Sequence, residues 1–315
     1  MGLVTRNDVV EAAERIAGLV EKTPLIETRI SGNTVWLKCE CLQTGHAFKL
    51  RGATNRLLQL SEEERKRGVV AFSSGNHAQG VAIAAKRLGI RAIIVMPADA
   101  PAVKVNATRR QGAEIIFYDR RTESREAIAQ KLADETGATI VPSFDDPAIV
   151  AGQGTVGLEI LEQMPIPPRR IVVPCGGGGL ASGIALVCPD AEVVIVEPEG
   201  WDDMRRSLAL GEIVPVAADA PASLCDALLT PRVSPITFEI LRERSAEALA
   251  VDDSEVKEAV RFAWREHQLV VESGGAVALA ALLAGKVEPM EGTVAVVSGG
   301  NIDPRLHARI VGESA

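Results

Sequence analysis

Residues 169–187 read RRIVVPCGGGGLASGIALV. An apolar run, four consecutive glycines and a second apolar run follow one another, which predicts a buried strand, a tight loop and a helix. The same order recurs from Val69, where VVAF precedes SSGNHAQG and VAIAAKRLG. Strands that alternate with helices of this length form βαβ units, so the chain is predicted to be an α/β protein with mostly parallel sheets.

Most of the remaining chain shows the same alternation. Ser61, with Glu64 three residues later, matches a capping box and predicts the start of a short helix. Prolines interrupt the pattern between residues 207 and 250, where we expect irregular structure. The other expected strands lie at residues 34–39, 92–96, 114–118, 139–142, 192–198 and 293–297, and the other expected helices at 8–20, 101–111, 122–135, 148–164 and 253–267.

Length and composition exclude several classes of protein. The 315 residues are 47% hydrophobic and 24% charged, which is enough material for a core in two lobes. The net charge is −8 without a basic run and aromatic residues make up 3%, so we expect neither nucleic acid nor a membrane as a partner. The amino-terminal segment has no continuous apolar stretch, which predicts a cytoplasmic protein. The five cysteines are interpreted as buried, reduced thiols.

Lys49 stands between Phe48 and Leu50, where a helical pattern begins. A lysine between apolar residues is unusual for a charge that only faces water. Lysine is also the side chain that forms Schiff bases with carbonyl cofactors, of which pyridoxal phosphate is the commonest. A cofactor lysine would require a phosphate site, a partner for the cofactor ring and a carboxylate site elsewhere in the chain.

The four glycines at residues 176–179 predict the phosphate site. Their backbone N–H groups can converge on an anion, and the helix that follows adds its N-terminus. A dinucleotide site requires GxGxxG and an NTPase loop requires GK followed by Ser or Thr, but here Leu180 follows the last glycine and the next one is Gly183. A plain flexible turn, the alternative, does not need four glycines, whose ordering costs entropy.

Two further polar loops follow predicted strands. SSGNH at residues 73–77 offers hydroxyl and N–H groups at a helix start, which suits a carboxylate; an ordinary Ser N-cap is the alternative. SGGN at residues 298–301 follows the last apolar strand. Because the carboxyl ends of parallel strands lie at one edge of a sheet, the three loops are expected to form one small-molecule site.

Together these motifs resemble the fold-type II pyridoxal-phosphate enzymes, which have a tryptophan synthase beta-like fold, and within them the serine/threonine dehydratase and serine racemase branch. FKLRGATN at residues 48–55 is similar to the cofactor-lysine motif, and the three loops are similar to the family's carboxylate, phosphate and pyridine-nitrogen motifs. AGQGTVGLEI at 151–160 and VVESGGAVALAAL at 270–282 extend the likeness to nearly the whole chain.

The resemblance implies two three-layer lobes with parallel sheets. Residues 1–64 and 146–315 would form a large, discontinuous cofactor-binding domain, and residues 65–145 a small mobile domain that carries the carboxylate loop. Closure of the two domains would exclude water from the site between them.

The resemblance also assigns a role to each motif residue. Lys49 would hold the cofactor as an imine and then take the α-proton, and Ser74 matches the opposite-face base of the racemases. Arg125 matches an arginine near the racemase active site, although an exposed helix charge is the alternative. The implied cofactor contacts are Phe48, Lys49, Asn76, Gly176, Gly177, Gly178, Gly179 and Ser298. The implied substrate contacts are Ser73, Ser74, Asn76, His77 and Arg125.

A cation site is implied by VEPEGWDDM at residues 196–204, which resembles a stretch that binds magnesium, manganese or calcium in this branch. Glu197, Asp203 and the carbonyl of Trp201 would be the ligands, since two carboxylates and a carbonyl suit a hard cation. A solvated acidic helix start is the alternative.

Two stretches depart from the family pattern. His46 and Ala47 replace the usual Gly and Ser before Phe48, which affects the local cofactor contacts and the substrate pocket. In CDALLTPRVSPITF, residues 225–238, Ala227 replaces the first glycine of a Gly-rich run that lines the other edge of the ring in relatives.

The activity that the resemblance implies is deaminating dehydration of L-threonine or L-serine to 2-oxobutanoate or pyruvate and ammonia, by a homodimer. Serine racemisation and elimination from 3-hydroxyaspartate are alternatives on the same scaffold. A sulfur amino-acid synthase is less well matched, because the ending SGGN is dehydratase-like. A protein that binds the cofactor without catalysis is the alternative from a different class.

Overall fold

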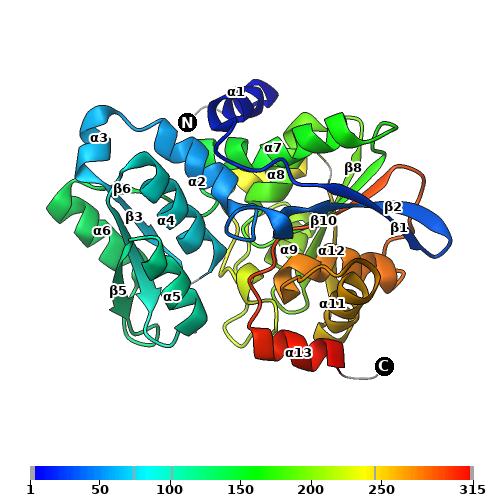
Figure 1. Cartoon of the computed structure of the whole chain (residues 1–315). Helices are drawn as coiled ribbons and strands as arrows, with labels where there is room; N and C mark the ends of the chain where they lie inside the picture. Colours follow the sequence, from blue (N-terminus) through cyan, green and yellow to red (C-terminus); the bar gives the residue numbers. More distant parts are fainter. Residues whose placement is uncertain (1–3, 74, 101, 245, 313–315) are drawn as a thin grey trace.

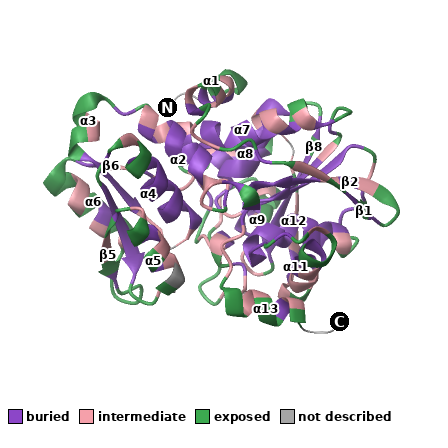
Figure 2. Cartoon of the chain, in the orientation of Figure 1, coloured by how far each residue is buried: buried purple, intermediate pink, exposed green. Residues whose placement is uncertain are grey.

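The computed structural model describes residues 4–312, except residues 74, 101 and 245. The chain forms two sheets that lie side by side, and helices cover both (Figure 1). The strands and the helix faces that pack on them are buried, whereas the outer helix faces are largely exposed (Figure 2). The prediction of an α/β fold with parallel sheets is confirmed.

The larger sheet has six strands in the order β1-β2-β10-β7-β8-β9, and the pairing of β1 with β2 is antiparallel while the others are parallel. Ser31 and Gly32, at the turn between β1 and β2, both have positive φ, as a type I′ hairpin turn requires. The strands are β1 (Leu25–Ile30), β2 (Asn33–Cys39), β10 (Thr293–Val297), β7 (Arg170–Pro174), β8 (Glu192–Pro198) and β9 (Glu247–Val251).

Helices bury both faces of this sheet, so its central strands are runs of valine and isoleucine rather than alternating patterns. One face packs against α11 (Asp253–His267), α12 (Ser273–Leu283) and α13 (Pro304–Gly312). The other face packs against α1 (Arg6–Ile16), α7 (Pro147–Gln163), α8 (Gly179–Val187), α9 (Asp203–Leu210) and α10 (Pro235–Glu243).

The smaller sheet is parallel throughout, in the order β5-β4-β3-β6. Its strands come from residues 69–140, inside the segment expected to form the small domain; they are β3 (Val69–Phe72), β4 (Ala92–Pro97), β5 (Glu114–Tyr118) and β6 (Thr139–Ile140). One face packs against α2 (Lys49–Leu58), α4 (Asn76–Leu88) and α5 (Ala102–Arg110), and the other against α6 (Arg125–Thr136).

Local sequence signals were reliable where the pattern was regular. The predicted capping box is present, with Ser61 and Glu64 bonded reciprocally at the start of α3 (Glu62–Arg67). The five cysteines are buried and free, as interpreted. The expectation of irregular structure over residues 207–250 was wrong in part, because α10 and β9 lie there. Pro235 is at the first turn of α10, where proline favours a helix start instead of breaking the pattern.

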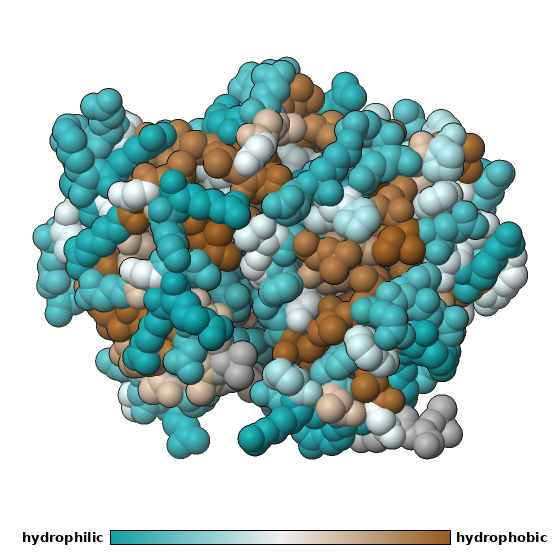
Figure 3. Space-filling view, viewed as in Figure 1, coloured by the Kyte–Doolittle hydropathy of each residue, from teal (hydrophilic) through white to brown (hydrophobic). Residues whose placement is uncertain are grey.

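The surface is mixed in character. Hydrophilic side chains cover most of the face seen in Figure 3, and apolar side chains show between them. In the part of the chain that the structure describes, no helix is long and apolar enough to cross a bilayer.

Helix α7 approaches two neighbours very closely, because glycines meet at both contacts. A Cβ on Gly152 would lie 2.6 Å from the Cα of Gly52 in α2. A Cβ on Gly183 of α8 would lie 2.5 Å from the backbone nitrogen of Gly154. The stretch AGQGTVG therefore brings the backbones of α2 and α8 into contact with α7.

Gly183→Ala should lower the free energy of unfolding by about 1–3 kcal/mol, the usual cost of overpacking, because the new methyl group collides with the α7 backbone. Chemical denaturation followed by circular dichroism measures the change. Gly312→Ala in α13 is the matched control, since a Cβ at that helical position meets nothing within 4 Å. Equal stability of the two variants would contradict the close contact of α7 with α8.

Candidate active site

One cavity of about 620 Å³ collects the three loops that the sequence predicted to meet. It lies where β3, β7 and β10 end, because parallel strands present their carboxyl ends at the same sheet edge. Ser74 is outside the described residues. The predicted residues that line the cavity are Phe48, Lys49, Ser73, Asn76, His77, Arg125, Gly176, Gly177, Gly178, Gly179 and Ser298.

Lys49 is the first residue of α2, and its side chain faces this cavity. Its Nζ donates a hydrogen bond to the carbonyl of Ser143 at 3.0 Å and lies 5.1 Å from the centroid of the Phe48 ring. Burial disfavours the charged ammonium and lowers the pKa of Lys49 to about 8. A substantial fraction of this lysine is therefore a neutral amine near physiological pH.

The start of α2 is fixed to the end of β10. Phe48 precedes the helix without a side-chain cap, and its N–H donates to the carbonyl of Ser298 at 3.2 Å. Ala47 forms an antiparallel bridge with Gly299. The departure at Ala47 thus leaves a backbone pairing that places Lys49 beside Ser298.

The four glycines connect β7 to α8 and require their lack of a side chain. Gly178 has a φ of +86°, and a Cβ on Gly177 would lie 2.2 Å from the Phe144 ring. The loop therefore carries backbone N–H groups and no side chain at the start of α8. Such a helix start attracts an anion the size of a phosphate.

The carboxylate loop begins α4. Ser73 Oγ accepts a hydrogen bond from the N–H of Gly75 at 3.2 Å. His77 lies with Nε2 2.9 Å from the carbonyl of Val141, and its Nδ1 is buried with no partner among the described residues. Burial, and then the nearby Lys49, lower the pKa of His77 to about 3, so the imidazole is neutral at physiological pH.

Glu272 is a buried residue of the site whose role the sequence reasoning missed. It precedes α12, and burial raises its pKa to about 7. Asn76 Nδ2 donates to Glu272 Oε1, and Asn301 Nδ2 donates to Asn76 Oδ1 at 2.8 Å. These two bonds fix the orientation of the Asn76 amide. A carboxylate directly before Ser-Gly-Gly, inside the apolar run VVESGG, was the available signal.

Phe144 and Leu228 form further parts of the cavity wall that the sequence reasoning did not single out. Phe144 lies against the Gly loop. Leu228 belongs to the 3-10 turn η2 (Asp226–Leu228), and a Cβ on Gly176 would lie 3.2 Å from its Cα. The departing segment 225–238 therefore packs directly against the Gly loop.

Arg125 and several other cationic residues lie on the open side of the cavity. The Arg125 guanidinium lies 5.5 Å from the centroid of the Phe72 ring, is about one third exposed and pairs with Glu126 at 2.8 Å. The two interpretations of Arg125 thus each describe part of its surroundings. The other cations of the lining are Lys104, Arg120 and Arg232, and Lys104 pairs with Asp226.

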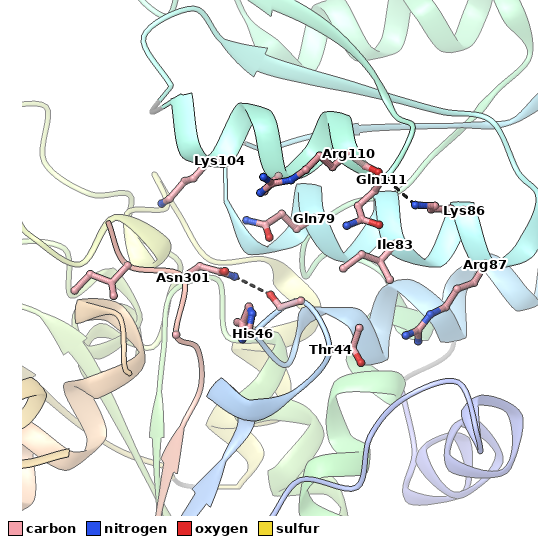
Figure 4. A pocket seen from close by; sticks show the side chains of 14 residues that line it. Thr44, His46, Gln79, Ile83, Lys86, Arg87, Lys104, Arg110, Gln111 and Asn301 are labelled. Carbon is pink, nitrogen blue, oxygen red and sulfur yellow. Dashed lines mark hydrogen bonds between the residues drawn. The ribbon is translucent and has the colours of Figure 1, made fainter. Parts of the chain in front are cut away.

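His46 lines a second cavity, of about 660 Å³, and not the Lys49 cavity. In Figure 4 it lies with Thr44 and Asn301 opposite side chains of α4 and α5. Its backbone is left-handed, with a φ of +56°, a conformation that favours glycine. The cationic residues of this lining are Lys86, Arg87, Lys104 and Arg110, so Lys104 belongs to both cavities.

The implied cation ligands lie apart from both cavities, where β8 ends and α9 begins. Glu197 accepts hydrogen bonds from the N–H groups of Met204 and Arg205 at 3.0 and 2.8 Å. Both carboxylate oxygens of Asp203 are buried without a partner among the described residues. Burial raises the pKa of Asp203 to about 6 and raises that of Glu197. The described residues contain no group of three His, Cys, Asp or Glu side chains that could hold a metal, so a third ligand would be a carbonyl such as that of Trp201.

The cavity fits pyridoxal phosphate in three independent respects. Its lysine has a lowered pKa, its anion site is a glycine loop at a helix start, and Ser298 is buried beside both. A bulkier residue at Gly177 would collide with Phe144 within the loop. The residues present therefore suit the phosphate, the carbonyl and the ring of this cofactor.

Comparisons with known proteins agree with this fit. The family model "Pyridoxal-phosphate dependent enzyme" matches residues 16–299. The chain is 44% identical to L-threo-3-hydroxyaspartate ammonia-lyase from a Pseudomonas species, over 99% of each chain. It is 40% identical to serine racemase from Schizosaccharomyces pombe, over 99% of this chain and 98% of the other. The crystal structure of a threonine deaminase from the organism abbreviated T.th. is similar with a TM-score of 0.88, at 40% identity over 94% of this chain and 98% of that chain.

Relatives with three different activities thus share one fold and nearly the full length of this chain. The chain belongs to the fold-type II family of pyridoxal-phosphate dependent enzymes.

Proposed function

We propose that this protein is a lyase that uses pyridoxal phosphate to remove water and then ammonia from a small 3-hydroxy amino acid. L-Threonine and L-serine, which would give 2-oxobutanoate and pyruvate, are the first candidate substrates. The observation that carries the proposal is the buried Lys49 amine, with a pKa of about 8, in the same cavity as the Gly loop and the Ser298 hydroxyl.

Each wall of the cavity would hold one part of the cofactor. The N–H groups of residues 176–179 suit the phosphate. The Asn76 amide has one N–H beyond its bond to Glu272, and this group could donate to the ring hydroxyl. Ser298 would face the ring nitrogen. When bound at Lys49, pyridoxal phosphate withdraws electrons from the α-carbon of an amino acid and so weakens its C–H bond.

Lys49 would take the α-proton at Nζ. Because burial lowers its pKa to about 8, the amine reaches its basic form much closer to physiological pH than an exposed lysine does. Ser298 offers the ring nitrogen a neutral hydroxyl and not a carboxylate, which favours rapid loss of the β-hydroxyl group over storage of charge in the ring.

The loop at residues 73–77 would hold the substrate carboxylate at the start of α4. The neutral imidazole of His77 has a free Nδ1 for this purpose, and the helix N-terminus adds N–H groups. We also propose that residues 65–145 move as a unit, so that closure of this loop over the substrate excludes water.

Lys49→Ala should abolish turnover and the visible absorption of the protein-bound cofactor, because the amine that both bonds the cofactor and removes the proton is lost. Spectrophotometry of the cofactor-loaded protein and an assay for 2-oxo acid measure the two effects. Lys131→Ala, on the exposed face of α6, is the matched control. A Lys49→Ala protein that kept the absorption band and the activity would contradict the role of Lys49.

A substrate panel separates the proposed activity from its rivals. L-Threonine, L-serine, D-serine and the 3-hydroxyaspartate isomers are each scored for 2-oxo acid and for the enantiomer that remains. Inversion of serine that is lost in Ser74→Ala would indicate a racemase. Cofactor binding without product from any of these compounds would indicate a non-catalytic binding protein.

The second candidate substrate is 3-hydroxyaspartate. The cationic side chains on the open side of the cavity, with Arg125 over the Phe72 ring, suit a substrate that carries a second carboxylate. The Pseudomonas relative named L-threo-3-hydroxyaspartate ammonia-lyase supports the same candidate.

Arg125→Gln distinguishes the two candidates. If a second carboxylate bonds to this guanidinium, kcat/KM for L-threo-3-hydroxyaspartate should fall by about tenfold or more, the usual effect of losing a charged hydrogen bond. The value for L-serine should change little. Arg121→Gln is the matched control, because Arg121 is exposed and is not among the residues that line the cavity. Equal losses on both substrates would contradict recognition of a second carboxylate by Arg125.

We further propose that Glu197, Asp203 and the Trp201 carbonyl bind magnesium, manganese or calcium. Two buried carboxylates raise each other's pKa, and a divalent cation would relieve this repulsion. The unpartnered oxygens of Asp203 are the observation that supports the site.

Asp203→Asn tests the cation site. Saturating magnesium or calcium, at about 100 times the dissociation constant, should stabilise the wild-type protein by about 2.7 kcal/mol and raise its Tm by about 5 °C. The variant should show no such increase in a thermal melt, because a neutral amide binds a hard cation weakly. Asp190→Asn, at an exposed position, should respond as the wild type does. The same increase in Asp203→Asn would exclude this site.

A further inference from the structure

A buried group of charged side chains packs against the first turn of α2. It consists of Lys38 from β2, Glu40 from the 3-10 turn η1 (Glu40–Leu42), Arg51 from α2 and Glu159 from α7, and is called the Arg51 cluster below. Lys38, Glu40 and Arg51 are at most 1% exposed. None of these four residues is among those that line the Lys49 cavity.

The Arg51 guanidinium is bonded to two carboxylates at once. Its Nε and Nη2 each donate to Glu40 at 2.8 Å, and its Nη1 and Nη2 donate to Glu159 at 2.6 and 2.9 Å. Nη1 also lies 3.3 Å from Thr155 Oγ1, and Nη2 donates to the carbonyl of Glu21 at 3.1 Å. This double fork is a geometry that the ammonium group of a lysine cannot reproduce.

Lys38 completes the cluster from the strand β2. Its Nζ donates to Glu159 at 2.5 Å and to the carbonyl of Thr23 at 2.8 Å. Burial alone would raise the pKa of Glu159, but the bonds from Arg51 and Lys38 lower it overall. The carboxylate therefore stays ionised, and the charges of the cluster remain paired over the physiological pH range.

The position of Arg51 in α2 connects the cluster to the reactive lysine. Lys49 and Arg51 are the first and third residues of the helix. Successive residues of an α-helix turn by about 100°, so these two side chains leave α2 on nearly opposite sides. Phe48 gives the helix no side-chain cap. A rotation of the first turn would swing the Lys49 amine through the cavity, and the cluster opposes that rotation from behind.

We propose that Arg51 is a positioning residue for Lys49, which fixes the rotation of the first turn of α2 and so directs the lysine amine at the carbonyl carbon of the cofactor. The inference rests on the proposed role of Lys49. A purely stabilising role explains the cluster less well, because buried ion pairs are often no more stabilising than apolar side chains of the same volume.

The test compares two cofactor forms on the Arg51→Lys protein without substrate. Pyridoxal phosphate bonds covalently to Lys49, whereas pyridoxamine phosphate has the same ring and phosphate but no aldehyde. We expect the affinity for pyridoxal phosphate to fall by about tenfold or more, and the affinity for pyridoxamine phosphate by less than about threefold, because only the former needs an aligned amine. The pH midpoint of the visible absorption band should also shift. Fluorescence titration and absorption spectra measure these quantities.

Arg56→Lys is the matched control. Arg56 lies in the same helix and pairs with Asp146 at 2.9 Å, outside the Arg51 cluster. It should leave both affinities and the pH midpoint unchanged. The proposal is wrong if Arg51→Lys weakens both cofactor forms equally, if it changes neither, or if Arg56→Lys reproduces its effect.

Glu159→Gln is the second variant, in case Arg51→Lys does not fold. It removes one charge from the less buried side of the cluster and should give the same pattern with a smaller change. Neither variant needs turnover for its readout. A wild-type protein that shows the band but converts no 3-hydroxy amino acid overturns only the proposed function, whereas a wild-type protein without the band overturns both proposals.

Discussion

The close contact of α7 with α2 and α8 is the constraint on which the geometry of the active site depends. Gly152 meets Gly52 on one side of α7, and Gly154 meets Gly183 on the other. Because α2 begins with the reactive lysine and α8 begins in the Gly loop, α7 sets the distance between the amine and the anion site. Glycines are needed at these crossings since a single methyl group would separate the backbones.

Burial, more than neighbouring charge, tunes the groups around the cavity. Desolvation is the cause of the lowered pKa of Lys49 and the largest cause of the shifts in the pKa of His77 and Glu272. Each of these groups is thereby shifted toward its neutral form. A site with few fixed charges of its own leaves the electrostatics to whatever charged groups enter it, while the cationic residues remain at its open side.

The parts of the site that could be predicted from sequence have local signals. Four consecutive glycines after an apolar run, and a polar loop after each of two further strands, are visible without any knowledge of the fold. The parts that could not be predicted depend on distant partners. Asn76 meets Glu272 across 196 positions of the chain, and Arg51 meets Glu159 across 108. No spacing rule connects such pairs, so nothing in the local sequence singles out Glu272 or Glu40.

The same limit explains two differences between the expected and the observed structure. The prolines between residues 207 and 250 suggested irregular structure, but one of them starts α10, and β9 gains its order from pairing with β8. The position of His46 beside the cofactor-lysine motif suggested an effect on the cofactor pocket, yet its left-handed backbone turns it into the second cavity. The roles of the individual site residues, the cation and the two-domain division remain predictions.

The burial of the cysteines has a consequence for how the motion of this protein can be followed. All five are at most 2% exposed, and burial is the largest cause of the rise in the pKa of Cys188 and Cys225 to about 12. Alkylating reagents attack the thiolate, so the closed protein is nearly inert toward them. Cys175 directly precedes the four glycines. Its rate of alkylation therefore records how often the phosphate loop opens to solvent, without any added probe.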